Sequence, residues 1–140
     1  MKNAILIVDD SRLNRETLAD ILKDKYNIIE AEDGRSGLEV LEKRKDDIVL
    51  VILDIVMPGM DGFAVCRALK ADPRSRDIPV IFLSAMQDLS DRTAAFAAGG
   101  VDYVSKPFFE EEILARASTH IQLYRSAQQL AELLSIRTAE

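Results

Sequence analysis

Acidic, hydroxyl and amine side chains stand at the ends of short apolar runs in this 140-residue chain. Asp9 and Asp10 follow one run, Asp54 follows a second, and Ser84 and Lys106 come after two later ones. If these runs are neighbouring strands, the five side chains meet at one edge, where close carboxylates repel one another unless a cation lies among them. Oxygen ligands without Cys or His favour Mg²⁺. The pattern therefore predicts a metal-dependent site.

Each of these residues also has a purely structural interpretation. Asp9 or Asp10 can help to cap the helix that follows, backbone groups can satisfy Ser84, and Lys106 can be a solvated surface lysine. Asp54 is harder to explain in this way, because it directly follows six apolar residues and an unpaired buried charge is costly. The joint placement of the five residues favours the functional interpretation.

Apolar runs of strand length alternate with helical patterns along the chain. The runs are Ala4–Val8, Asn27–Ala31, Ile48–Leu53, Pro79–Leu83 and Val101–Val104. The helical patterns begin after Ser11, after Gly34, at Phe63, at Leu89 and after Pro107. Runs that are apolar on both faces suit parallel strands covered by helices on both sides, and the chain is too short for an eight-unit barrel. We predict an α/β fold with an open, doubly wound parallel sheet.

Composition excludes several classes of protein. The chain has 48% hydrophobic and 30% charged residues, the balance of a folded domain rather than a disordered one. A formal charge of -6 argues against direct nucleic-acid or membrane binding, which needs a basic surface. One cysteine excludes an internal disulfide, and the short apolar run near the N-terminus is too short for a signal peptide. We expect a single cytoplasmic domain.

Four motifs in this order resemble the receiver domain of a bacterial two-component response regulator, of the kind found in chemotaxis regulators. They are Ile7–Asp10, Leu53–Gly62, Leu83–Ala85 and Asp102–Phe108. The resemblance covers roughly residues 4–118 and implies a flavodoxin-like, five-stranded sheet of order 2-1-3-4-5. We therefore expect a receiver domain over residues 1–121 and a helical extension over residues 122–140.

The resemblance implies that Asp54 is the phosphoacceptor, which takes a phosphoryl group from the phosphohistidine of a histidine kinase or phosphotransfer protein. It further implies that Asp9, Asp10, Asp54 and the backbone carbonyl of Val56 hold Mg²⁺. Such a domain is a phosphoacceptor switch and not an enzyme beyond its own phosphotransfer and dephosphorylation. The physical chemistry agrees, because phosphoryl transfer needs positioned reactants and neutralised oxygens.

The resemblance also implies a switch that responds to the phosphoryl group. Lys106 is expected to pair with one phosphoryl oxygen, and the hydroxyl of Ser84 to donate to another. The movement of Ser84 would vacate space for Tyr103 to turn inward. The structural alternative for Tyr103 is an amphipathic side chain at the edge of the core.

Two positions beside the expected acceptor bear on the lifetime of the phosphoryl group. In the family, the residues two after the acceptor and two after the hydroxyl flank the route of the attacking water. Here they are Val56 and Met86, both apolar, so we expect slow hydrolysis. Elsewhere, Cys66 is expected to be a small core residue and His120 a surface imidazole far from the acidic edge.

Two other classes of protein share part of this pattern. A flavin-binding electron carrier can have the same strand order, but it would need a hydroxyl-rich phosphate loop where Asp9 and Asp10 stand. An aspartate-nucleophile phosphatase typically has a second Asp two residues after its nucleophile, where Val56 stands. Both are weaker interpretations than the receiver.

A helical pattern continues to about Arg137, beyond the expected end of the domain. Leu123, Ala127, Leu130 and Leu134 follow the 4-3-4 spacing of a short coiled-coil seam. We expect this stripe to mediate a homodimer, and we expect an output module beyond Glu140. The alternative is a helix that folds back onto the domain or frays.

Overall fold

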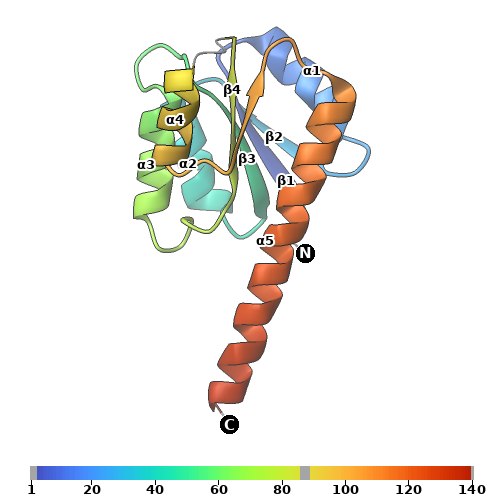
Figure 1. The fold of residues 1–140 in the computed structure, drawn as a ribbon, viewed down its shortest axis with the longest axis vertical. Helices are drawn as coiled ribbons and strands as arrows, with labels where there is room; N and C mark the ends of the chain where they lie inside the picture. The colour runs from blue at the N-terminus through green and yellow to red at the C-terminus, as the bar shows by residue number, and fades with distance from the viewer. Residues whose placement is uncertain (1–2, 86–88, 140) are drawn as a thin grey trace.

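The computed structural model describes residues 3–85 and 89–139. Within these residues, five strands alternate with five helices (Figure 1). The strands are β1 (Ala4–Val8), β2 (Asn27–Ala31), β3 (Ile48–Asp54), β4 (Val80–Ser84) and β5 (Asp102–Ser105). The helices are α1 (Arg12–Leu22), α2 (Gly34–Arg44), α3 (Gly62–Ala71), α4 (Leu89–Ala97) and α5 (Glu110–Ala139). The strands are parallel in the order β2-β1-β3-β4-β5, which confirms the predicted flavodoxin-like fold.

The centre of the sheet is buried on both faces. Every residue of β1, β3 and β4 is buried, whereas β2, at one edge, is partly exposed. Helices α1 and α5 lie on one face, and α2, α3 and α4 lie on the other (Figure 1). This two-sided cover is the physical reason why the central strands are almost continuously apolar in sequence.

The carboxyl ends of three strands lie one residue beyond the predicted runs, and β4 and β5 also begin one residue later than predicted. β3 extends to Asp54 because the backbone ladder continues there, with Asp54 opposite Leu83 of β4. β4 and β5 end at Ser84 and Ser105, which lie opposite each other. Backbone pairing does not require an apolar side chain, so the polar residues at the strand ends belong to the strands themselves.

Local signals in the sequence mark the starts and ends of the helices, and α2 and α3 each begin one residue earlier than predicted, at Gly34 and Gly62. The side chain of Ser11 caps α1 by accepting from the backbone N–H of Asn14. Gly62 starts α3 where the loop turns back onto β3: a Cβ at Gly62 would lie 2.2 Å from the carbonyl oxygen of Asp54. Gly99, with a φ of 111°, follows α4 and ends it. The close return at Gly62 brings the loop after β3 against the end of that strand.

Helix α5 first covers the sheet and then extends past it (Figure 1). Ile121 and Tyr124 are buried, and Arg125 donates to the side-chain oxygen of Asn3 at 2.7 Å. Residues 126–135 are all exposed. The contacts of the helix with the domain thus continue slightly past Ile121, and the division between domain and extension at that residue stays a prediction.

None of the helices in the described ranges combines the length and the hydrophobicity that a bilayer span requires.

Candidate metal and phosphoacceptor site

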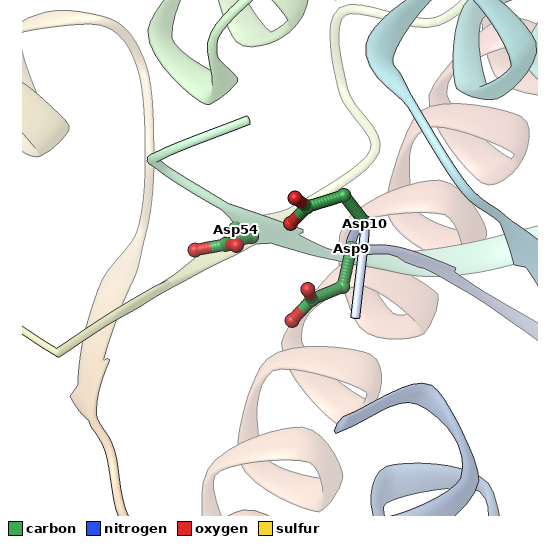
Figure 2. Close-up of side chains that lie close together, drawn as sticks. All are labelled: Asp9, Asp10 and Asp54. Atoms are coloured by element: carbon green, nitrogen blue, oxygen red, sulfur yellow. The ribbon is translucent and has the colours of Figure 1, made fainter. Parts of the chain in front are cut away.

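Three aspartates gather at the adjacent carboxyl ends of β1 and β3, as Figure 2 shows. Asp9, Asp10 and Asp54 each offer a carboxylate oxygen, and these atoms all lie within 4.8 Å of one another. Asp9 and Asp54 are buried, whereas Asp10 is exposed. The three ligands are all oxygen and carry negative charge, which is the donor set that Mg²⁺ prefers. The residues present therefore fit the predicted metal.

Lys106 brings a positive charge into this cluster from the end of β5. Its Nζ lies 3.4 Å from Oδ1 of Asp54 and 3.7 Å from Oδ2 of Asp9. Its backbone N–H donates to the carbonyl oxygen of Ser84 at 2.8 Å, so the end of β4 and the lysine are tied together. The structure thus assembles the predicted residues from four separate segments of the chain.

The negative charge of Asp54 is only partly compensated by its neighbours. Burial and the nearby charge of Asp9 raise the pKa of Asp54 to about 6, although Lys106 and a hydrogen bond from the backbone N–H of Val56 act in the opposite direction. A carboxyl group in this state gains from an additional cation. The side chain of Val56 is 63% exposed, at the mouth of the site.

Asp9 has its own set of donors from the start of α1. Its Oδ1 accepts from the backbone N–H of Ser11 at 2.9 Å, and its Oδ2 accepts from the amide Nδ2 of Asn14 at 3.2 Å. Nη1 of Arg15 donates to the carbonyl oxygen of Asp9 at 2.6 Å. Asp9 therefore has structural partners at the start of α1, and its role as a metal ligand stays a prediction. The sequence alone did not predict that Asn14 and Arg15 contact Asp9. Their position in the first turn of the helix after Asp9 could have indicated these contacts.

The two residues of the predicted switch are both buried. Ser84 is the last residue of β4, and Tyr103 lies in β5 opposite Phe82 of β4. The guanidinium carbon of Arg92 lies 5.7 Å from the centroid of the Tyr103 ring. Tyr103 is thus buried next to Arg92 of α4, and the inward turn expected on phosphorylation stays a prediction. Met86, the second position in the predicted route of water, lies outside the described residues.

The structure corrects the expectation that His120 is a surface imidazole. Its Nε2 lies 2.9 Å from Oδ2 of Asp102, and the side chain is only 17% exposed. Arg116 donates to both oxygens of Asp102 at 2.8 Å. Burial would raise the pKa of Asp102, but the hydrogen bonds from Arg116 and His120 outweigh it and hold that pKa below its usual value. Arg116 and His120 are four residues apart on α5, so both side chains reach Asp102 of β5. The sequence alone did not show that this face of the helix lies next to β5.

The expectation for Cys66 is confirmed. The residue is buried in α3, and its thiol donates to the carbonyl oxygen of Ala98 at 3.3 Å. The side chain is thus packed in the core, and this burial raises the pKa of the thiol.

Residues 5–118 match the family described as the response regulator receiver domain. The chain belongs to this family. Receiver domains are phosphoacceptor switches of phosphorelay signalling; they interact with histidine kinases and typically bind Mg²⁺ through acidic residues. In this receiver, the cluster of Asp9, Asp10 and Asp54 is the acidic set at the expected edge of the sheet.

Relatives and solved structures agree with this assignment. The receiver is 35% identical over 137 residues to the uncharacterized transcriptional regulatory protein YrkP of Bacillus subtilis, covering 94% of this chain and 55% of that protein. It is 39% identical over 117 residues to the response regulator PleD of Caulobacter vibrioides, covering 83% and 25%. The chemotaxis response regulator CheY4 of Vibrio cholerae superposes with a TM-score of 0.79 at 26% identity, covering 86% of this receiver and 99% of that chain. The receiver thus spans about half or less of the length of these two curated relatives.

Removal of the Asp54 carboxylate is expected to stabilise the metal-free receiver at high pH. Because folding raises the pKa of Asp54 from 3.8 to about 6, the stability that this group contributes falls as the pH rises between those values and stays low above them. Asp54→Asn is expected to raise the free energy of unfolding by about 1–3 kcal/mol at pH 8 in EDTA. The gain should shrink towards pH 4, as measured by denaturant unfolding.

The matched control is Asp46→Asn, which removes an exposed carboxylate just before the start of β3, whereas Asp54 is at the end of that strand. It should give no comparable gain. A lower free energy of unfolding for Asp54→Asn than for the parent at pH 8 would contradict the electrostatic account.

Proposed function

We propose that this receiver accepts a phosphoryl group on Asp54 from the phosphohistidine of a sensor histidine kinase or a phosphotransfer protein. The observation that carries the proposal is the placement of Asp54: a buried carboxylate at the end of a central strand, with the ammonium group of Lys106 at 3.4 Å and two further carboxylates close by. In the transfer, an oxygen of Asp54 forms a bond to phosphorus while the bond from phosphorus to the imidazole nitrogen breaks. The protein catalyses only this step and the later hydrolysis.

Asp9, Asp10 and Asp54, together with the backbone carbonyl of Val56, would hold Mg²⁺. The ion would neutralise phosphoryl oxygens during the transfer. Lys106 supports the proposal from the side of the protein, because its ammonium group already lies within 4 Å of the Asp54 carboxylate. A phosphoryl group on Asp54 would offer this ammonium group additional oxygens to bind.

Ser84 and Tyr103 would report phosphorylation to the surface of α4, β5 and α5. A phosphoryl oxygen can accept from the hydroxyl of Ser84, and the carbonyl oxygen of Ser84 is already bonded to the backbone of Lys106. Tyr103 lies beneath α4, where a change of its side chain alters the surface next to Arg92. Moving the conformational balance from 1:99 to 99:1 needs about 5.5 kcal/mol of differential binding, which a few charge-assisted hydrogen bonds supply.

We further propose that the signal passes through α5 to an output module in the cytoplasm. The share of each relative that this receiver covers, 55% of YrkP and 25% of PleD, supports such an arrangement. The direction of α5 supports it as well, because the helix leaves the sheet and extends away from it (Figure 1). YrkP is named as a transcriptional regulatory protein, which offers one class of output. In that case, nucleic acid would be bound by the output module and not by this acidic receiver.

A second copy of this chain would cover the exposed stripe of α5. Leu123, Leu130 and Leu134 are 54–62% exposed, and they lie on one face together with Ala127. Glu132 is the only charged residue between Ser126 and Ser135, so two such helices meet with little charge repulsion. The heptad spacing suits a paired helix. We therefore propose a homodimer through α5.

Asp54→Asn is expected to abolish phosphorylation, because a neutral amide replaces the nucleophilic carboxylate. Lys106→Ala is expected to accept the group with a blunted conformational response, because the pairing of the phosphoryl oxygens is lost. Incubation with acetyl phosphate and Mg²⁺, followed by mass spectrometry and by NMR of the α4–β5–α5 surface, measures both. Undiminished phosphate incorporation in Asp54→Asn, mapped to another residue, would contradict the proposal.

The phosphoryl group is expected to be long-lived, because the exposed apolar side chain of Val56 next to the site cannot hydrogen-bond an attacking water. Introducing polar groups with Val56→Asn and Met86→Glu is expected to speed the loss of phosphate at least severalfold. The decay of the phosphorylated species after removal of the phosphodonor measures this rate. Equal decay in the double variant and the parent would refute the explanation.

Leu130→Glu with Leu134→Glu is expected to convert dimers of the full chain into monomers, because like charges would face each other in the apolar stripe. Multi-angle light scattering across a concentration series, with and without acetyl phosphate, measures the mass. Gln129→Glu, an exposed change beside the stripe, is the control and should leave the dimer intact. A parent that is monomeric at high concentration in both conditions would disprove the dimer.

A further inference from the structure

The carboxylate of Asp9 is held by hydrogen bonds from the start of α1. It is fully buried, and both of its carboxylate oxygens accept hydrogen bonds from the start of α1: Oδ1 from the backbone of Ser11 and Oδ2 from the side chain of Asn14. The Asp10 side chain is exposed. The position of the Asp9 carboxylate is therefore set by its neighbours in the protein, whereas Asp10 can adjust.

The backbone of Asp9 is fixed as well. Its N–H donates to the carbonyl oxygen of Ala31 in β2 at 3.2 Å, and its carbonyl oxygen accepts from Nη1 of Arg15 at 2.6 Å. Nε of Arg15 also donates to Oε1 of Glu30 in β2 at 3.1 Å. With its backbone held against β2, Asp9 retains freedom mainly in its side chain, which is the part that Asn14 contacts.

Asn14 and Lys106 both approach the same oxygen of Asp9. Nζ of Lys106 lies 3.7 Å from Oδ2 of Asp9, and Nδ2 of Asn14, in α1, donates to that oxygen at 3.2 Å. Without the amide, the ammonium group would draw the carboxylate towards itself. An amide also differs from a cationic donor in an important respect: it orients the carboxylate without cancelling the charge that attracts a divalent ion.

We infer that Asn14 is a positioning residue for the cation site, which keeps the Asp9 carboxylate turned towards the ion and away from Lys106. The inference rests on the proposed function, because it concerns the same Mg²⁺ site. Hydrogen-bond partners of metal ligands commonly change metal affinity by 10–100-fold when they are removed.

The test is Mg²⁺ binding to the unphosphorylated full chain, measured by isothermal titration calorimetry at a temperature where every variant is fully folded by circular dichroism. Asn14→Ala removes the amide without adding bulk and places a strong helix former in α1. It is expected to raise the Kd for Mg²⁺ about tenfold. Asn14→Gln retains an amide on the same side of the helix and is expected to recover part of the affinity.

Thr17→Ala is the matched control. Its hydroxyl donates to the carbonyl oxygen of Leu13 in the same helix at 2.9 Å rather than to Asp9. This variant should bind Mg²⁺ as the parent does. A Kd for Asn14→Ala within twofold of the parent, or an equal loss in Thr17→Ala, would overturn the role of Asn14 while leaving the metal site intact. A parent that does not bind Mg²⁺ would overturn the metal site itself, and with it this inference.

Discussion

Asp9 and Asp54 are both buried at the ends of adjacent strands, and the repulsion between their carboxylates is the interaction on which the rest of the site depends. Burial removes the water that would screen the two charges, so the protein must supply positive charge or hydrogen-bond donors. Lys106 supplies part of that charge and the first turn of α1 supplies donors. The raised pKa of Asp54 shows that this compensation is incomplete. A site in this state favours the arrival of a cation and a phosphoryl group together.

The parallel sheet provides the rigid support that such a cluster needs. Strands β1 and β3 are adjacent and buried throughout, so neither aspartate can retreat into solvent without disturbing the centre of the fold. The loop after β3 returns closely onto the strand at Gly62, where a larger residue would collide with the backbone. Asp9 and Asp54 are therefore needed for the proposed function but lower the stability of the fold, because the apolar core that surrounds them does not stabilise their charges.

The opposite end of the domain has a different character. There α5 leaves the sheet after Tyr124, and its exposed part is rich in leucine and poor in charge. The Asp102–Arg116–His120 cluster ties the covering part of α5 to β5, the strand that also carries Tyr103. A rearrangement of β5 would therefore move the covering part of α5 directly. This physical connection links the acidic edge of the sheet with the helix that extends beyond it.

The fold class, the order of the elements and the residues that gather in the acidic cluster could all be predicted from the sequence. Apolar runs such as Ala4–Val8 coincide with strands because burial on both faces demands them, and Asp54 is visible as a charge directly after such a run. Strand ends were predicted to within one residue, since backbone pairing continues through polar residues that hydrophobicity does not mark. These features depend on the local sequence pattern, so they can be predicted without knowing which segments lie next to each other in the fold.

Tertiary structure alone decided the contacts between side chains. The sequence did not show that Asn14 contacts Asp9, that His120 binds Asp102, or that the ring of Tyr103 is buried near Arg92. Each contact depends on the rotamers and on the distance between segments that the crossovers bring together, and hydrophobic periodicity carries no information on either. For this reason the residues of the acidic cluster were predictable as a set, whereas the donors that orient them became evident only in the folded chain.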